Sequence, residues 1–113
     1  MNASYVPDVG DLVWLDFDPR AGHEQSGRRP AIVLTTRDYN EAASLAVVCP
    51  VTHQVKGYPF EVVLPSGSGF EGAILADQVK SVDWRARRAE YQGKAGVSVV
   101  DDLRERLRAL LSL

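Results

Sequence analysis

Five stretches of the chain are rich in apolar and β-branched residues, and turn-forming residues separate most of them. Runs of this length and composition predict β-strands, and continuous apolar runs predict strands that are buried on both faces. The predicted strands are 11–17 (DLVWLDF), 31–35 (AIVLT), 45–51 (LAVVCPV), 60–64 (FEVVL) and 72–82 (GAILADQVKSV).

Two of these predicted strands contain an interruption. Pro50 has no backbone N–H to donate to a neighbouring strand, so we expect its strand to end, bulge or lie at a sheet edge there. The long 72–82 run becomes polar at Asp77–Gln78, where we expect it to bend. The glycine-rich segment 65–69 (PSGSG) predicts a hairpin or a short loop.

The C-terminal segment has the spacing of an amphipathic helix. Ser98 is suited to cap its N-terminus, and Asp101 three residues later completes a capping-box-like pair. Asp102 and Arg106 form a favourable i,i+4 pair on the polar face. The predicted buried face comprises Val99, Val100, Leu103, Leu107, Leu110 and Leu111.

Five or six strands and one terminal helix predict an α+β protein built on a small, strongly curved sheet or barrel. A chain of 113 residues suits a single domain, 1–113. No apolar run is long enough to span a bilayer and the start lacks the features of a signal peptide, so we expect a cytoplasmic protein. The single cysteine, Cys49, and two histidines cannot form a zinc site of familiar spacing, and we expect no metal or cofactor.

The net charge of −2 conceals an uneven distribution along the chain. Residues 1–27 hold five acidic residues and one arginine, whereas residues 80–94 hold five basic and two acidic residues. An acidic chain is unsuited to indiscriminate polyanion binding, but the basic segment is available for phosphate groups. An ordinary solvated edge is the alternative interpretation of this segment.

Segment 22–34 (GHEQSGRRPAIVL) places charged side chains directly before a predicted core strand. The guanidinium groups of Arg28 and Arg29 can bind phosphate oxygens and stay charged at physiological pH. The strand behind them would fix the geometry of such an anion site. Alternatively, Glu24 forms a surface ion pair with one of these arginines. His23 is either a proton donor or a solvated loop residue.

Segments 49–62 (CPVTHQVKGYPFEV) and 76–88 (ADQVKSVDWRARR) add further polar groups beside predicted core strands. Hydroxyl, amide, ammonium and aromatic groups together can hold unstacked bases and phosphates. Core packing is the alternative for the aromatic residues, and we favour it for Phe60 and Trp84. The candidate ligand-binding residues are Arg28, Gln54, Lys56, Tyr58, Asp77, Gln78 and Lys80.

Four segments of this chain resemble the MazF/PemK/Kid group of bacterial toxin endoribonucleases, most closely its MazF branch. They are 5–19 (YVPDVGDLVWLDFDP), 22–34, 56–64 (KGYPFEVVL) and 76–87 (ADQVKSVDWRAR). The resemblance implies a toxin on an SH3-like barrel that forms homodimers and cleaves single-stranded mRNA at specific sequences, ACA-type sites being common in the group. It also implies inhibition of translation and growth, and neutralisation by an acidic, MazE-like antitoxin with a disordered tail.

The resemblance also implies which residues carry the chemistry. Glu24 matches the group's loop carboxylate, Arg29 its arginine before the proline, and Thr52 the threonine after the second buried strand. RNA supplies its own nucleophile, the 2′-OH, so no metal-bound water is needed. Glu24 can accept the 2′-OH proton, Arg29 can stabilise the developing charge, and Thr52 can position the phosphate. His23 or Arg29 then protonates the leaving oxygen.

The Kid branch uses a somewhat different set of residues. His23 and Asp77 match its loop histidine and its aspartate. Its arginine two residues before that aspartate is replaced here by Leu75, which favours Arg29 as the essential guanidinium. Arg28 occupies a position that varies within the group, and we expect it to have no catalytic role.

Two other functions remain open on the sequence. One is a non-catalytic toxin of the CcdB type that binds DNA gyrase, although that branch lacks the Glu24–Arg29 pair. The other is an SH3-like binding module with an incidental charged loop. Cleavage of single-stranded RNA in excess EDTA separates all three.

Overall fold

The computed structural model describes residues 4–17 and 27–113 and has the predicted α+β architecture. Within these residues, seven strands form an antiparallel sheet, accompanied by two α-helices and one 3₁₀-helix. In chain order the elements are β1 (Asp11–Asp16), β2 (Arg28–Val33), α1 (Arg37–Ala43), β3 (Ala46–Thr52), β4 (Glu61–Val63), β5 (Ala73–Leu75), η1 (Ala76–Gln78), β6 (Lys80–Val82), β7 (Glu90–Lys94) and α2 (Val97–Leu111).

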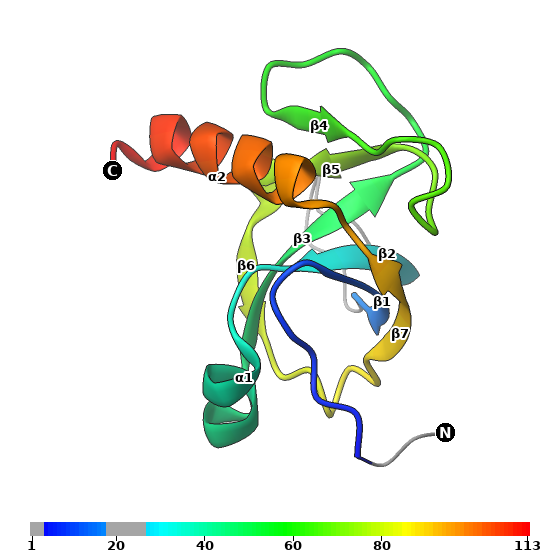
Figure 1. Cartoon of the computed structure of the whole chain (residues 1–113), viewed down its shortest axis with the longest axis vertical. Helices are drawn as coiled ribbons and strands as arrows, with labels where there is room; N and C mark the ends of the chain where they lie inside the picture. Colours follow the sequence, from blue (N-terminus) through cyan, green and yellow to red (C-terminus); the bar gives the residue numbers. More distant parts are fainter. Residues whose placement is uncertain (1–3, 18–26) are drawn as a thin grey trace.

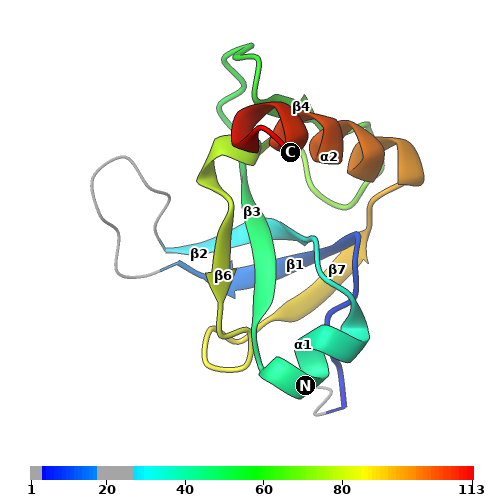
Figure 2. The same cartoon turned by 90° about the vertical axis from the view of Figure 1, so that its left-hand side faces the viewer.

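The strands follow the order β4-β5-β3-β2-β1-β7, and β6 pairs with β3 beside β5. Helix α2 lies across one end of this sheet and α1 lies at the opposite end (Figures 1 and 2). Across residues 4–17 and 27–113, the outer strands β4 and β7 are not paired with each other. The pairings therefore establish a sheet with a C-terminal helix, and the SH3-like barrel that the resemblance implies stays a prediction.

Strand alternation divides the core into two clusters on the two faces of the sheet. On β1, Leu12 belongs to one cluster, whereas Val13 and Leu15 belong to the other. Successive side chains of a strand point to opposite faces, so a strand buried on both sides feeds both clusters. This explains why the predicted core strands read as continuous apolar runs.

Helix α2 confirms the predicted C-terminal helix and most of its buried face. Asp102 and Arg106 form the expected pair, at 3.3 Å. Leu110 and Leu111, however, are 47% and 53% exposed, because the last turn projects beyond the sheet (Figure 1). The residues that pack on the sheet are Val99, Val100, Leu103 and Leu107.

The predicted helix cap is wrong. Helix α2 begins at Val97, so Ser98 lies inside it, and the N-cap is Gly96. The backbone N–H groups of Val99 and Val100 donate to the Gly96 carbonyl, and no side chain caps the helix. No helix in the described part of the chain is long and apolar enough to cross a membrane.

The predicted bend near Asp77–Gln78 is confirmed. Helix η1 occupies this position and separates β5 from β6, which both pair with β3. Strand β3 continues past Pro50 to Thr52 and does not end there, but Pro50 lies at a local sheet edge, because β6 pairs with β3 only up to Val48 and β5 only from Val51. The carbonyl of Val47 accepts from Leu34 on the β2 side, so alternation turns the backbone of Pro50 to the other side. There η1 interrupts the neighbouring strands, and a missing N–H is tolerated.

Three elements differ from the prediction. Strand β2 begins at Arg28 rather than at position 31, because Arg28 and Arg29 pair with the end of β1. Helix α1 and strand β7 were not predicted. Asn40 of α1 is fully buried and its side chain donates to the carbonyls of Pro7 and Thr35, so specific polar contacts hold this short helix.

Candidate functional site

The ends of β1 and β2 form the base of segment 18–26. The backbone N–H of Phe17 donates to the carbonyl of Gly27 at 2.8 Å. Two predicted catalytic residues, His23 and Glu24, belong to this segment and lie outside the described residues. The alternative ion pair of Glu24 lies outside them as well.

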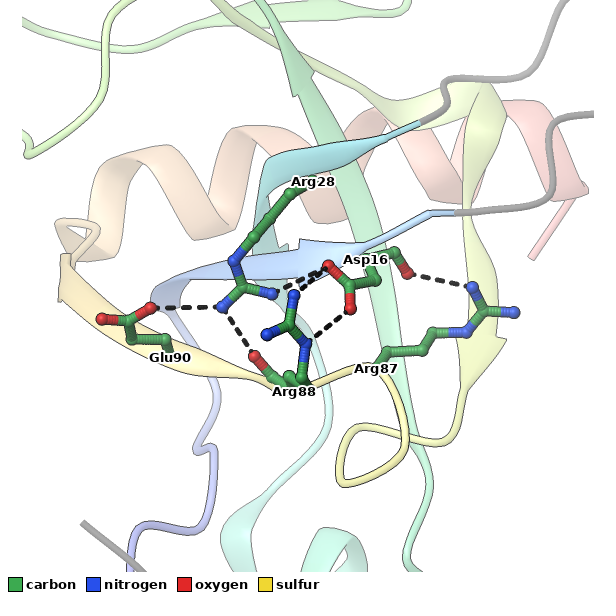
Figure 3. Close-up of polar contacts among 5 residues, drawn as sticks. All are labelled: Asp16, Arg28, Arg87, Arg88 and Glu90. Atoms are coloured by element: carbon green, nitrogen blue, oxygen red, sulfur yellow. Dashed lines mark hydrogen bonds and ion pairs between the residues drawn. The ribbon is translucent and has the colours of Figure 1, made fainter. Parts of the chain in front are cut away.

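Asp16, the last residue of β1, is the centre of an ion-pair cluster. Arg28 Nη1 lies 3.0 Å from its Oδ1, and Arg88 Nε lies 2.9 Å from its Oδ2. Arg28 also donates to Glu90 Oε1 at 3.2 Å and to the carbonyl of Arg88 at 2.8 Å (Figure 3). The hydrogen bond from Arg88, and then that from Arg28, hold the pKa of the Asp16 carboxyl below its usual range.

The basic segment 80–94 makes intramolecular contacts in this structure. Arg87 donates to the backbone carbonyl of Asp16 at 2.9 Å (Figure 3). Arg85 stacks on the ring of Trp84 at 4.1 Å and donates to Ser44. Trp84 is 5% exposed, which confirms its predicted place in the core. These arginines thus stabilise the connection between β6 and β7.

Three of the predicted site residues project from one face of the sheet. The β2–β3 register pairs Ala31 with Pro50, and continuing it by two residues places Arg29 opposite Thr52. Both side chains lie on the face that carries the second core cluster, by alternation with Val33 and Val48. Lys80, opposite Val48 on β6, lies on the same face, with its Nζ 5.5 Å from the Phe17 ring. Alternation directs Arg28 to the other face.

Thr52 is 7% exposed and ends β3. Its Oγ1 accepts a hydrogen bond from the N–H of Gln54 at 3.1 Å, which turns the chain out of the sheet. Arg29, half-buried in β2, and Thr52 are therefore both placed by regular strand structure. A strand positions a reacting group more reproducibly than an irregular loop does.

Residues 53–60, called the 53–60 loop below, connect β3 to β4. Gln54, Lys56 and Tyr58 are exposed on this loop. Lys56 Nζ lies 6.0 Å from the Tyr58 ring centre, and the Tyr58 and Phe60 rings are 5.5 Å apart. Phe60 packs against the first core cluster, as we favoured, while Tyr58 is 50% exposed. The loop thus presents an amide, an ammonium group and an aromatic face to solvent.

Helix η1 carries the remaining candidates. Asp77 is exposed and Gln78 is half-buried. Burial, with the nearby charge of Asp77 as a second cause, raises the pKa of the Cys49 thiol to about 12. Cys49 is therefore a neutral core residue beneath η1 at physiological pH.

A model of the PemK-like, MazF-like toxins of type II toxin–antitoxin systems matches residues 8–111. The chain belongs to this family. It is a homologue of endoribonuclease toxin MazF of Escherichia coli (strain K12), with 48% identity over 111 residues that cover 98% of this chain and 99% of that protein.

Solved structures of MazF proteins have the same fold. MazF from Deinococcus radiodurans (Form-I) matches with a TM-score of 0.93 and 53% identity, over 96% of this chain and 99% of that one. The MazE–MazF complex (Form-II) from the same organism matches with a TM-score of 0.86 and 48% identity, over 96% and 98% of the two chains.

Several residues that shape the structure around the site of this MazF homologue carry little or no signal in the sequence. In the sequence, Asp16 is one of five acidic residues of segment 1–27 with no assigned role, and Glu61 belongs to the predicted strand 60–64. Gly72 and Arg106 carried no functional signal at all. Only Asp16, near the end of the predicted strand 11–17 and twelve residues before Arg28, offers a sequence pattern that could indicate its contacts.

Proposed function

We propose that this protein is the toxin of a type II toxin–antitoxin system and cleaves single-stranded RNA at specific sequences without a metal ion. The supporting observation is the similarity to MazF over nearly the whole of both chains. The placement of Arg29 and Thr52 on one face at adjoining strand ends agrees with this proposal. The family model spans 8–111, which supports one toxin domain over 1–113.

The proposed reaction is attack of a 2′-OH on the adjacent phosphorus. A bond forms between O2′ and phosphorus while the bond to O5′ breaks, giving a 2′,3′-cyclic phosphate and a 5′-hydroxyl. Glu24 accepts the 2′-OH proton, Arg29 stabilises the charge on the non-bridging oxygens, and Thr52 positions the phosphate. His23 or Arg29 returns a proton to O5′. DNA lacks the nucleophile and is not cleaved.

The proposed RNA-binding surface surrounds the face of the sheet that carries Arg29 and Thr52. The 53–60 loop contributes exposed polar and aromatic groups, and stacking of bases on a tyrosine is a common means of holding single strands. Helix η1 and β6 border the same region. The proposed RNA-binding residues of this surface are Gln54, Lys56, Tyr58, Asp77, Gln78 and Lys80. Arg28 stays a proposed RNA-binding residue, although it lies on the other face and forms an ion pair with Asp16.

The proposal extends to assembly and partners. A MazE–MazF complex is known for the Deinococcus radiodurans protein, and we propose an acidic, MazE-like antitoxin with a disordered tail for this chain. We propose a homodimer, because Leu110 and Leu111 at the end of α2 and Leu113 just after it leave apolar surface exposed. An SH3-like barrel is the proposed description of the sheet, supported by the edge-to-face contact of Phe70 with Trp14 across it. We expect a cytoplasmic toxin that inhibits translation and growth.

The test is a cleavage assay on single-stranded RNA in excess EDTA. We expect cleavage to persist and to leave cyclic-phosphate ends, which end-mapping identifies together with the recognised sequence. A substrate with a 2′-deoxy or 2′-O-methyl nucleotide 5′ of the cut should resist. Equal cleavage of the deoxy substrate contradicts the internal-nucleophile mechanism. Absence of RNA cleavage, with inhibition of DNA gyrase, would favour the CcdB-like alternative.

A further inference from the structure

Glu61 is a carboxylate buried beneath the 53–60 loop. It is the first residue of β4 and is 6% exposed. Its Oε1 accepts hydrogen bonds from the backbone N–H groups of Gly57 at 2.8 Å and Lys56 at 3.1 Å. Gly57 adopts a positive φ of 78°, so the loop turns where the carboxylate binds it. Charge-assisted hydrogen bonds of this kind are stronger than those between neutral groups.

Arg106 of α2 holds the same loop from the other end. Its Nη1 donates to the carbonyl of Pro59. Its Nε is buried and lies 3.3 Å from Asp102 Oδ1, without the alignment of a hydrogen bond. Asp102 therefore holds the Arg106 guanidinium by charge, while Nη1 of the same group makes the hydrogen bond to the loop. The C-terminal helix is thus connected to a loop that lies far from it in the sequence.

We infer that Glu61 and Arg106 are positioning residues that set the conformation of the 53–60 loop for RNA binding. This inference rests on the proposed function. Both residues bind backbone groups of the loop, which leaves Lys56 and Tyr58 exposed for a ligand. An exposed loop that is ordered only on binding loses affinity through its conformational entropy, and bracing it beforehand removes that loss.

The inference separates substrate binding from chemistry. Arg29 and Thr52 are placed by β2 and β3, whereas Glu61 and Arg106 bind the loop at Lys56, Gly57 and Pro59. A loosened loop should therefore raise KM and leave kcat nearly unchanged. A residue that only stabilised the fold would lower the amount of active protein and not produce this split.

The test compares Arg106→Ala with Arg108→Ala. Both arginines lie on α2 beside an acidic partner, Arg108 at 3.5 Å from Glu105, but of these two described residues only Arg106 has a hydrogen bond to the loop. We expect Arg106→Ala to raise KM for RNA about tenfold, the equivalent of one hydrogen bond to a charged group. Arg106→Lys should recover part of this loss, and Arg108→Ala should leave KM unchanged. Equal KM values for the two alanine variants would overturn the inference, as would a loss confined to kcat.

A second measurement needs no RNA. Hydrogen exchange at the amides of Lys56 and Gly57 reports their bonds to Glu61 directly. We expect Glu61→Gln, which keeps the shape and one oxygen, to speed their exchange about tenfold, because a neutral acceptor is weaker. Arg106→Ala should speed it as well. Unchanged exchange in both variants would overturn the bracing role, whereas faster exchange in a protein that cleaves no RNA would overturn only the proposed function.

Discussion

Gly72 lies against Thr52 so closely that a Cβ at position 72 would come within 1.9 Å of the Thr52 carbonyl oxygen. Gly72 also has a φ of 119°, a region that side-chain-bearing residues rarely occupy. It precedes β5, whose first residue Ala73 pairs with Thr52. The end of β3, where a proposed catalytic residue stands, is thus formed around a position that only glycine fits.

Gly72→Ala is therefore expected to destabilise the fold and to displace Thr52. The energetic cost of backbone strain adds to the cost of the clash with the carbonyl group. We therefore expect the free energy of unfolding to fall by about 3 kcal/mol. Gly67→Ala is the matched control, because Gly67 also has a positive φ but an added Cβ there meets nothing within 4 Å. It should cost about 1 kcal/mol. Equal losses in urea unfolding would show that the contact with Thr52 does not matter.

Asp16→Asn tests the cluster at the base of segment 18–26. Arg88 and Arg28 lower the pKa of Asp16 in the folded state, so the ionised carboxylate stabilises the fold at pH values above the unfolded pKa near 3.9. This contribution is lost as pH falls through the depressed folded pKa. We therefore expect wild type to be more stable than Asp16→Asn at pH 7, with a difference that shrinks below about pH 4.

Urea unfolding at several pH values from 7 to 3 measures this difference. Asp101→Asn is the control, since Asp101 makes an exposed contact of 3.9 Å with Arg104 and should change stability little at any pH. A stability difference between wild type and Asp16→Asn that does not vary with pH would contradict the assigned ion pairs.

Arg29→Ala and Glu24→Ala are each expected to lower the rate of RNA cleavage by about 10²-fold or more, as the loss of an electrostatic or general-base group does. Arg85→Ala is the control, because it removes the same positive charge at another place, where Arg85 stacks on Trp84. It should leave the rate nearly unchanged. Melting temperatures decide the interpretation: a collapse of stability together with activity would support a purely structural ion pair.

The sequence predicted the elements whose side chains alternate or repeat over a sufficient length. Strands β1 and β3 and helix α2 have such patterns, because each buries a continuous face. Helix α1 and strand β7 do not. The sequence around Asn40 is polar. Helix α1 forms there because the Asn40 amide satisfies buried carbonyls, one of them distant in sequence.

The candidate site was predictable only in part, for a related reason. Arg29 and Thr52 could be named from a resemblance, but their placement at adjoining strand ends depends on the register of β2 against β3. The contacts of Arg106 with Pro59 and of Glu61 with the loop join positions that no local pattern links. Tertiary contacts between charged side chains and backbone groups leave no periodic trace in a sequence.

The proposed antitoxin supplies the final prediction. An inhibitor that covers an RNA-binding surface has to present carboxylates where RNA presents phosphates, and a disordered acidic tail can do so by folding on contact. Exposed ion pairs contribute little to the binding free energy and are screened by salt. The tail therefore also needs apolar residues that pack on exposed aromatic side chains such as Tyr58. We therefore expect its association rate to fall as ionic strength rises, with a smaller change in the dissociation rate.

Binding kinetics over a salt series, with RNA as competitor, measure this. Lys56→Ala should make association less sensitive to salt, because Lys56 is exposed on the 53–60 loop. Arg104→Ala is the charge-matched control, because Arg104 lies in the middle of α2 beside Asp101. RNA and the antitoxin tail should exclude one another, since both are proposed to bind the 53–60 loop. A ternary complex with both bound at full occupancy would show that the antitoxin acts at another surface.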